Sequence, residues 1–105
     1  MSTGIIGGNI TAMGVFQATV DLADTLANTT AVTSVTVPGV RVGDFVFVNK
    51  PSHEAGLGIV NVRVSAADTV EITTMNTTAG AINEVSETQI FLWVRPESIE
   101  AGIRP

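Results

Sequence analysis

Hydrophobic and polar residues alternate with a period of two over most of the chain, the pattern of β-strands that bury one face. The longest example runs from Ile10 to Leu22, where every second residue from Ile10 is apolar or glycine and the residues between include Thr, Gln and Asp. The pattern predicts a long, half-buried strand. Gly14 falls in the middle of it, so we expect a bend there.

Further alternating segments, rich in β-branched residues, predict five more strands. Gly, Pro, Asn and Asp, the common residues of turns, separate them. We expect these strands within residues 31–37, 40–49, 59–65, 69–75 and 87–95, and a short helical turn at most within 24–28 and 98–102. The chain is therefore expected to be all-β, a single-domain antiparallel β-sandwich or β-barrel.

The same alternation predicts which side chains form the core. The expected core residues are aliphatic and share the inward face of their strands: Val46, Val48, Val60, Val62, Val64, Ile72, Leu92 and Val94. Phe91 and Trp93 fall on the opposite face of the last strand. Because both faces of that strand are apolar, we expect Phe91 and Trp93 to contact another subunit.

A chain of 105 residues suits one domain. We divide it into a flexible N-terminal arm (1–9), a β domain (10–95) and a C-terminal tail (96–105). Three glycines surround Ile5 and Ile6 in the arm, and prolines bound the tail. Neither a basic leader followed by an apolar run nor a stretch of ~20 apolar residues is present, so we expect synthesis in a cytoplasm without processing.

Composition narrows the range of partners. Charged residues make up 14% of the chain, below the ~25% of typical domains, and the net charge is −5. The five Lys and Arg residues are spread along the sequence. We therefore expect neither nucleic acid nor a membrane as partner. The chain has no Cys, so disulfides and thiolate metal sites are excluded.

Candidate catalytic chemistry is sparse. His53, the only histidine, is followed by Glu54, which could orient it as a base, but no nucleophile motif accompanies the pair. The closely spaced acids Asp21 and Asp24 are more typical of solvated turns than of a cation site. We expect no catalytic residue, no metal, no cofactor and no small-molecule substrate, and hence no enzyme.

One segment of the chain resembles a known class of protein. It runs from Val37-Pro38-Gly39-Val40-Arg41-Val42-Gly43-Asp44-Phe45 to Pro51, continues from Ala55 through Gly56-Leu57-Gly58-Ile59-Val60-Asn61-Val62-Arg63-Val64 to Ala66, and ends with Thr69-Val70-Glu71-Ile72. This middle third resembles small virion structural proteins of tailed bacteriophages, including head decoration (cement) proteins and domains of tail-associated proteins. The resemblance implies a β-sandwich or barrel on the virion and carries no catalytic residue.

The expected function is therefore that of a decoration protein that binds the outer surface of the major capsid protein lattice, as a homotrimer joined through Phe91 and Trp93. We expect the N-terminal arm and the start of the first strand to make the capsid contact, by strand addition with apolar anchors. The candidate contact residues are Ile5, Ile6, Asn9, Ile10 and Met13. An alternative contact is the loop that contains Pro51, His53, Glu54 and Leu57.

A second function stays open. A tail-associated or fibre-type β module could bind host glycans, with Phe91 and Trp93 as a platform on which sugar rings stack.

Overall fold

The computed structural model describes residues 9–97, which form strands and no helix. The six strands are β1 (Ile10–Val20), β2 (Thr29–Thr36), β3 (Phe45–Asn49), β4 (Leu57–Ala66), β5 (Thr69–Asn76) and β6 (Glu87–Pro96). The expected all-β fold is confirmed, and all six strands lie close to the predicted segments.

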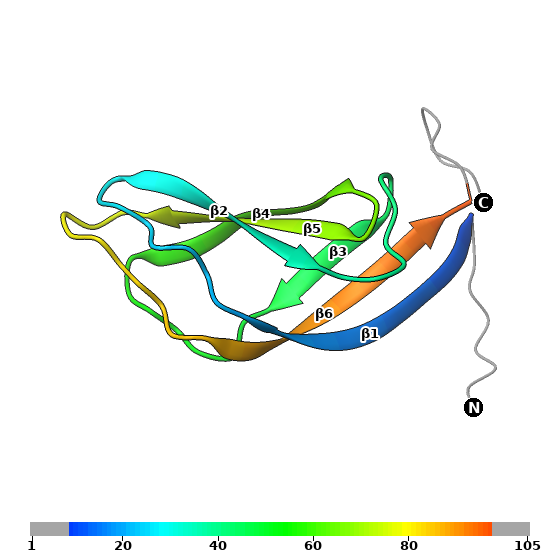
Figure 1. The fold of residues 1–105 in the computed structure, drawn as a ribbon, viewed down its shortest axis with the longest axis horizontal. Helices are drawn as coiled ribbons and strands as arrows, with labels where there is room; N and C mark the ends of the chain where they lie inside the picture. Colours follow the sequence, from blue (N-terminus) through cyan, green and yellow to red (C-terminus); the bar gives the residue numbers. More distant parts are fainter. Residues whose placement is uncertain (1–8, 98–105) are drawn as a thin grey trace.

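The strands form two antiparallel sheets of three strands each (Figure 1). Sheet A has the order β1-β6-β3, and sheet B has the order β2-β5-β4. The sheets stack face to face as a sandwich, in which β3 lies next to β4 while β1 and β2 make little contact. The sandwich is therefore closed on the β3–β4 side and open on the β1–β2 side.

One local expectation is wrong. Residues 24–28 form no helical turn, because Thr25 exchanges two main-chain hydrogen bonds of 2.9 Å with Ile82 and is held extended. The ladder is regular at Gly14, which pairs with Trp93, and the register shift of β1 lies between Ile10 and Ala12. The other candidate helix, 98–102, lies outside the described residues.

The core consists of apolar side chains on the facing sides of the two sheets. Its buried members are Val20, Leu22, Val37, Val40, Val46, Val64, Val70, Ile72 and Phe91. The predictions for Val46, Val64 and Ile72 are confirmed, and Val48 and Val62 pack against this core while partly buried.

Three core predictions are wrong. Val60 is exposed, because the register of β4 shifts between Ile59 and Asn61. Leu92 and Val94 lie on the outer face of β6, on the same side as Ile90. Since both faces of β6 are apolar, alternation alone could not choose the inward one, and the larger rings of Phe91 and Trp93 occupy it.

One polar side chain inside the core lacks a partner. Gln89 is fully buried on the inner face of β6, and neither atom of its amide is hydrogen-bonded. A buried amide without partners costs stability, about 1–3 kcal/mol, whereas an apolar side chain of the same shape does not.

We therefore expect Gln89→Met to raise the free energy of unfolding by about 1 kcal/mol or more in urea denaturation. The matched control is Gln17→Met, at an exposed glutamine of β1, which should change stability by less than about 0.5 kcal/mol. Equal effects of the two substitutions would show that the Gln89 amide is satisfied.

Candidate protein-binding face

The first part of the segment that carries the resemblance forms a loop between the two sheets. Residues 37–44 leave β2 of sheet B and enter β3 of sheet A, and glycines with positive φ, Gly39 (98°) and Gly43 (102°), allow the turns. Asp68 holds the beginning of this loop. Its carboxylate accepts the Gly39 N–H at 2.8 Å, and its main chain bonds to Val37 and Val40.

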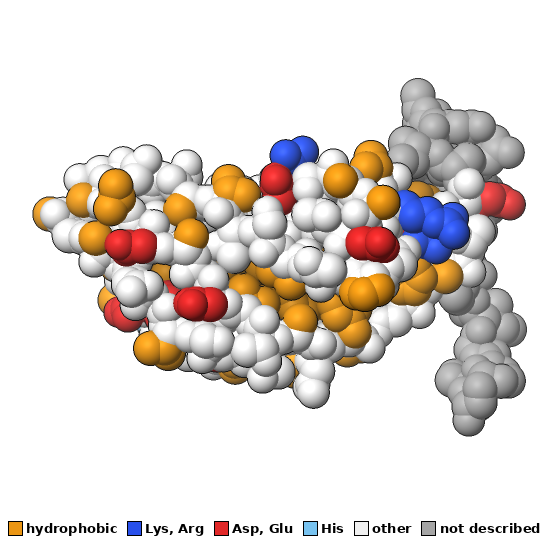
Figure 2. Space-filling view, viewed as in Figure 1, with side chains coloured by type: hydrophobic (Ala, Val, Ile, Leu, Met, Phe, Trp, Pro, Cys, Tyr) orange, Lys and Arg blue, Asp and Glu red, His pale blue; other side chains and the backbone are white. Residues whose placement is uncertain are grey.

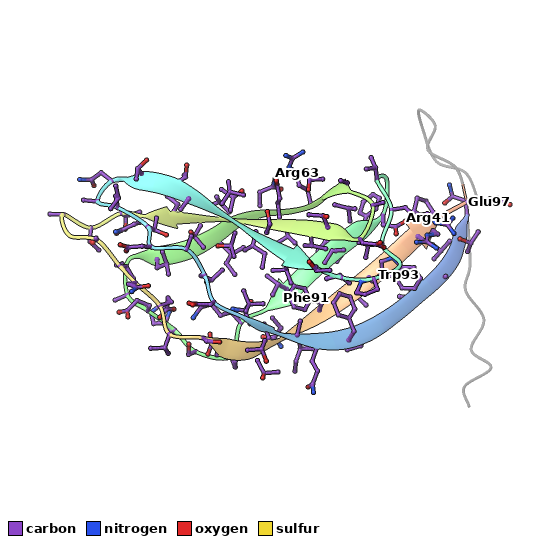
Figure 3. The ribbon with its side chains drawn as sticks, viewed as in Figure 1. Arg41, Arg63, Phe91, Trp93 and Glu97 are labelled. Atoms are coloured by element: carbon purple, nitrogen blue, oxygen red, sulfur yellow. The ribbon has the colours of Figure 1, made fainter. Side chains whose placement is uncertain are left out.

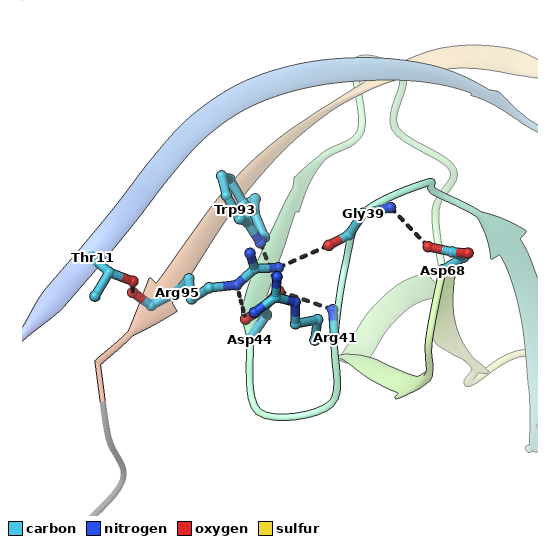
Figure 4. Close-up of polar contacts among 7 residues, drawn as sticks. All are labelled: Thr11, Gly39, Arg41, Asp44, Asp68, Trp93 and Arg95. Atoms are coloured by element: carbon cyan, nitrogen blue, oxygen red, sulfur yellow. Dashed lines mark hydrogen bonds and ion pairs between the residues drawn. The ribbon is translucent and has the colours of Figure 1, made fainter.

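Asp44 holds the end of the loop (Figure 4). Its side chain is only 3% exposed and forms a two-pronged ion pair with Arg95 of β6, at 2.8 and 3.0 Å. The indole N–H of Trp93 donates to the same carboxylate at 2.8 Å, and the Arg95 guanidinium also lies over the Trp93 ring. Arg95 further donates to the Gly39 carbonyl at 2.8 Å.

These bonds change the acidity of Asp44. The hydrogen bond from Arg95 lowers the pKa of Asp44 to about 2; burial opposes this, and Trp93 and the Arg41 N–H add to the lowering. The Asp44–Arg95 pair lies within sheet A, and the hydrogen bond from Arg95 to the Gly39 carbonyl ties it to the beginning of the loop, next to sheet B. The Asp44 carboxylate is fully engaged within the chain, so we assign this cluster a structural role.

Asp44 should make the stability of the protein acid-sensitive. Its folded pKa of about 2 lies below the ordinary 3.8, so its contribution, roughly 2 kcal/mol, is present above about pH 4 and is lost as the pH falls toward 2. We expect Asp44→Asn to lower the free energy of unfolding at pH 7 and to flatten its decline between pH 4 and pH 2, measured by urea denaturation.

The control for this change is Asp24→Asn, at an exposed carboxylate in the segment after β1. It should keep the acid-dependent decline of the wild type. An Asp44→Asn protein with an unaltered decline would contradict the role given to the cluster.

A second ionic cluster ties the β3–β4 loop to the chain before β6. Lys50 Nζ contacts Glu84 at 2.5 Å and Glu87 at 3.0 Å, and it donates to Ser52 Oγ at 2.9 Å. Burial alone would lower the pKa of Lys50, but the two carboxylates together raise it. This loop contains the alternative contact residues: Pro51, His53 and Glu54 are exposed, and Leu57 is half-buried at the start of β4. Their role in binding stays a prediction.

The other candidate contact residues, from the N-terminal arm and the start of β1, differ in where the structure places them. Ile5 and Ile6 lie outside the described residues. Asn9 and Ile10 are half-buried where β1 begins, and the Asn9 carbonyl accepts the Glu97 N–H. Met13 is exposed on the outer face of sheet A.

The proposed interface is wrong for Phe91. Its side chain is fully buried within its own chain (Figure 3), and its ring stacks on that of Phe16 with centroids 5.0 Å apart. Trp93 is half-buried against the core, and its indole N–H donates to Asp44. Without Phe91 the two rings cannot form the expected joint contact or sugar platform, and a contact through Trp93 alone stays a prediction.

The exposed apolar surface lies instead on the outer face of sheet A. Each strand of the sheet contributes neighbouring side chains to it: Met13 and Val15 of β1, Ile90, Leu92 and Val94 of β6, and Phe45 and Phe47 of β3. The register places them in rows, with Val15 and Phe47 on either side of Leu92, and Met13 and Phe45 on either side of Val94. We call these residues the apolar face.

The two outer faces of the sandwich differ in kind. The outward positions of sheet A within these strands carry no charged residue; Thr, Gln and Asn border the apolar face. Sheet B presents mostly Thr and Ser, with the exposed apolar residues Val32, Val60 and Met75 spread over its three strands, and an ion pair of 2.7 Å between Arg63 and Glu71. A contiguous apolar patch on one side only is typical of a surface that binds another protein.

The sequence contained a signal for this face. The stretch 45–49 and the last strand are apolar on both sides, which indicates that both sides are covered. What it could not show is that β1 adds Met13 and Val15 beside them, because this depends on the pairing of β1 with β6.

Comparison of the chain with protein-family models, curated proteins and solved structures found no match. Within residues 9–97, no group of His, Asp and Glu side chains is arranged to hold a metal ion, and no helix is long and apolar enough to cross a membrane.

Proposed function

We propose that this protein is a structural component of a phage virion, a head decoration protein that binds the outer surface of the major capsid protein lattice through the apolar face. The observation that carries the proposal is the contrast between the outer faces of the two sheets. Attachment through sheet A would leave the polar, Thr-rich face of sheet B toward solvent. The resemblance of residues 37–72 to virion proteins supports the choice of a capsid as partner.

A partner with a repeating surface can be bound stably through an apolar face of this kind. Seated on a lattice, an oligomer engages several capsid subunits at once, so contacts that are weak in one subunit add up to stable attachment. The role requires no reaction and no cofactor. Three copies around a local threefold position of the lattice stay our expected arrangement on the particle, each seated on the capsid through its own apolar face.

The second candidate is a tail-associated module that binds host glycans. The feature that favours it is the pair of exposed rings Phe45 and Phe47, two positions apart on one face of β3. Their cross-strand neighbours are Val94 and Leu92, which offer no hydrogen bonds to sugar hydroxyls. Protein binding is therefore the better-supported function.

The test compares two exposed apolar residues on opposite faces. Phe47 is 53% exposed on sheet A and Val32 is 51% exposed on sheet B. Phe47→Asp should weaken binding to purified particles that lack the protein by about tenfold or more, because a carboxylate would be desolvated at the contact. Val32→Asp should bind as the wild type does.

Both variants should keep the wild-type far-UV spectrum, since both residues are half exposed. Equal binding of the two variants would exclude the apolar face. Retention of the wild-type protein on a glycan array, with no binding to particles, would favour the second candidate.

A further inference from the structure

Strand β1 has a long unprotected edge. It pairs only with β6, and within the described part of the chain no strand lies on its other side. Residues Ile10–Val20 contain no charged residue and no proline. Soluble proteins normally protect such an edge, because its main-chain N–H and C=O groups can pair with another strand.

The other sheet edges are shortened, charged or partly covered. Strand β3 has only five residues and lies next to β4, which contains Arg63 and two register shifts. Strand β2, like β1, has no charged residue and no proline, but the preceding segment covers part of it, because the Ala23 N–H donates to the Thr33 hydroxyl at 2.7 Å. The edge of β1 is thus the exception within this sandwich.

The hydrogen-bonding direction along β1 can be assigned. The Thr11 hydroxyl donates to the Arg95 carbonyl at 3.1 Å, so that carbonyl faces β1 opposite Ala12. Because the direction alternates along an antiparallel ladder, Met13, Val15 and Gln17 direct their main-chain groups toward the open edge.

Two copies of β1 can pair in an antiparallel arrangement centred on Val15 with compatible side chains opposite each other. An antiparallel pairing of two copies centred there sets Val15 opposite Val15, Met13 opposite Gln17, and Ala12 opposite Ala18. On the inner face, Phe16 of one copy falls opposite Gly14 of the other, where no side chain opposes the ring. A cleft of about 530 Å³, lined by Phe16, Val37, Pro38, Val40, Trp93 and Arg95 among others, lies beside this position.

Figure 2 shows hydrophobic side chains in the hollow between the sheets on this open side of the sandwich. A second β1 would cover part of this surface and would supply roughly ten main-chain hydrogen bonds, a number typical of specific interfaces.

We propose that two copies of this chain pair through the edges of their β1 strands, antiparallel and about a twofold axis at Val15. Sheets A of the two copies then form one continuous sheet. A twofold axis perpendicular to that sheet puts both apolar faces on the same side, where they form one larger surface. The contact uses a strand edge, so it leaves the apolar face open and does not depend on the proposed function.

Cysteine cross-linking tests the pairing and its register, since the chain has no cysteine of its own. Val15→Cys should form a disulfide-linked dimer under mild oxidation, because the axis brings the two sulfurs together. Val32→Cys, at an exposed valine on edge strand β2, is the control and should stay monomeric. A mixture of Met13→Cys and Gln17→Cys proteins should form the mixed dimer in preference to either homodimer.

Sedimentation equilibrium gives an independent measurement. The wild-type chain should form a concentration-dependent dimer, and Val15→Pro, which removes a main-chain N–H from the open edge, should be monomeric with an unchanged far-UV spectrum. If Val15→Pro fails to fold, the cross-linking comparison still tests the pairing.

Three results would overturn the proposal. The first is cross-linking of Val15→Cys no faster than that of Val32→Cys. The others are a wild-type chain that is monomeric at all concentrations and a trimer that is cross-linked at neither valine.

Discussion

The arrangement of the sandwich depends on the loop between its two sheets, which one side chain holds at both ends: Arg95 pairs with Asp44 and donates to the Gly39 carbonyl. The carboxylate is almost fully buried, and it joins the loop that leaves sheet B to the central strand of sheet A. Asp68 fixes the other end of the same loop to the β4–β5 turn. Arg95 thereby keeps the beginning of the loop, next to β2 of sheet B, against β6 of sheet A.

That placement leaves sheet A with two surfaces that its own chain does not cover. With β3 beside β4, the sandwich closes on one side, and the open side exposes the edge of β1. With the inner face of β6 filled by Phe91 and Trp93, the aliphatic residues Ile90, Leu92 and Val94 must face outward. Both the apolar face and the proposed pairing of β1 follow from this geometry. A small domain that carries both can bind a partner surface and its own copy at the same time.

Alternation predicted the strands well, because the period of two is a local property of the chain. It was insufficient for β6, where both faces are apolar and the choice between Phe91 and Leu92 for the core depends on what β1 and sheet B place opposite them. It failed at Val60 because a register shift reverses the direction of a side chain without changing the composition around it. The segment from Val37 to Asp44 stood out in the sequence by resemblance, but its part in joining the sheets depends on Asp68 and Arg95, which are distant in the chain. The apolar face likewise draws on three strands that only the fold brings together.

The central claim, attachment through the apolar face, can be tested with the protein's own methionines. Met13 is 49% exposed on the outer face of sheet A, and Met75 is 42% exposed on the outer face of sheet B, so the two should oxidise at similar rates in the protein in solution. The measurement is the rate of peroxide oxidation at each, by peptide mass spectrometry, in the protein in solution and bound to particles. Attachment through sheet A predicts that Met13 becomes several-fold slower on particles while Met75 keeps its rate. Protection of Met75 with Met13 unchanged, or equal protection of both, would contradict it.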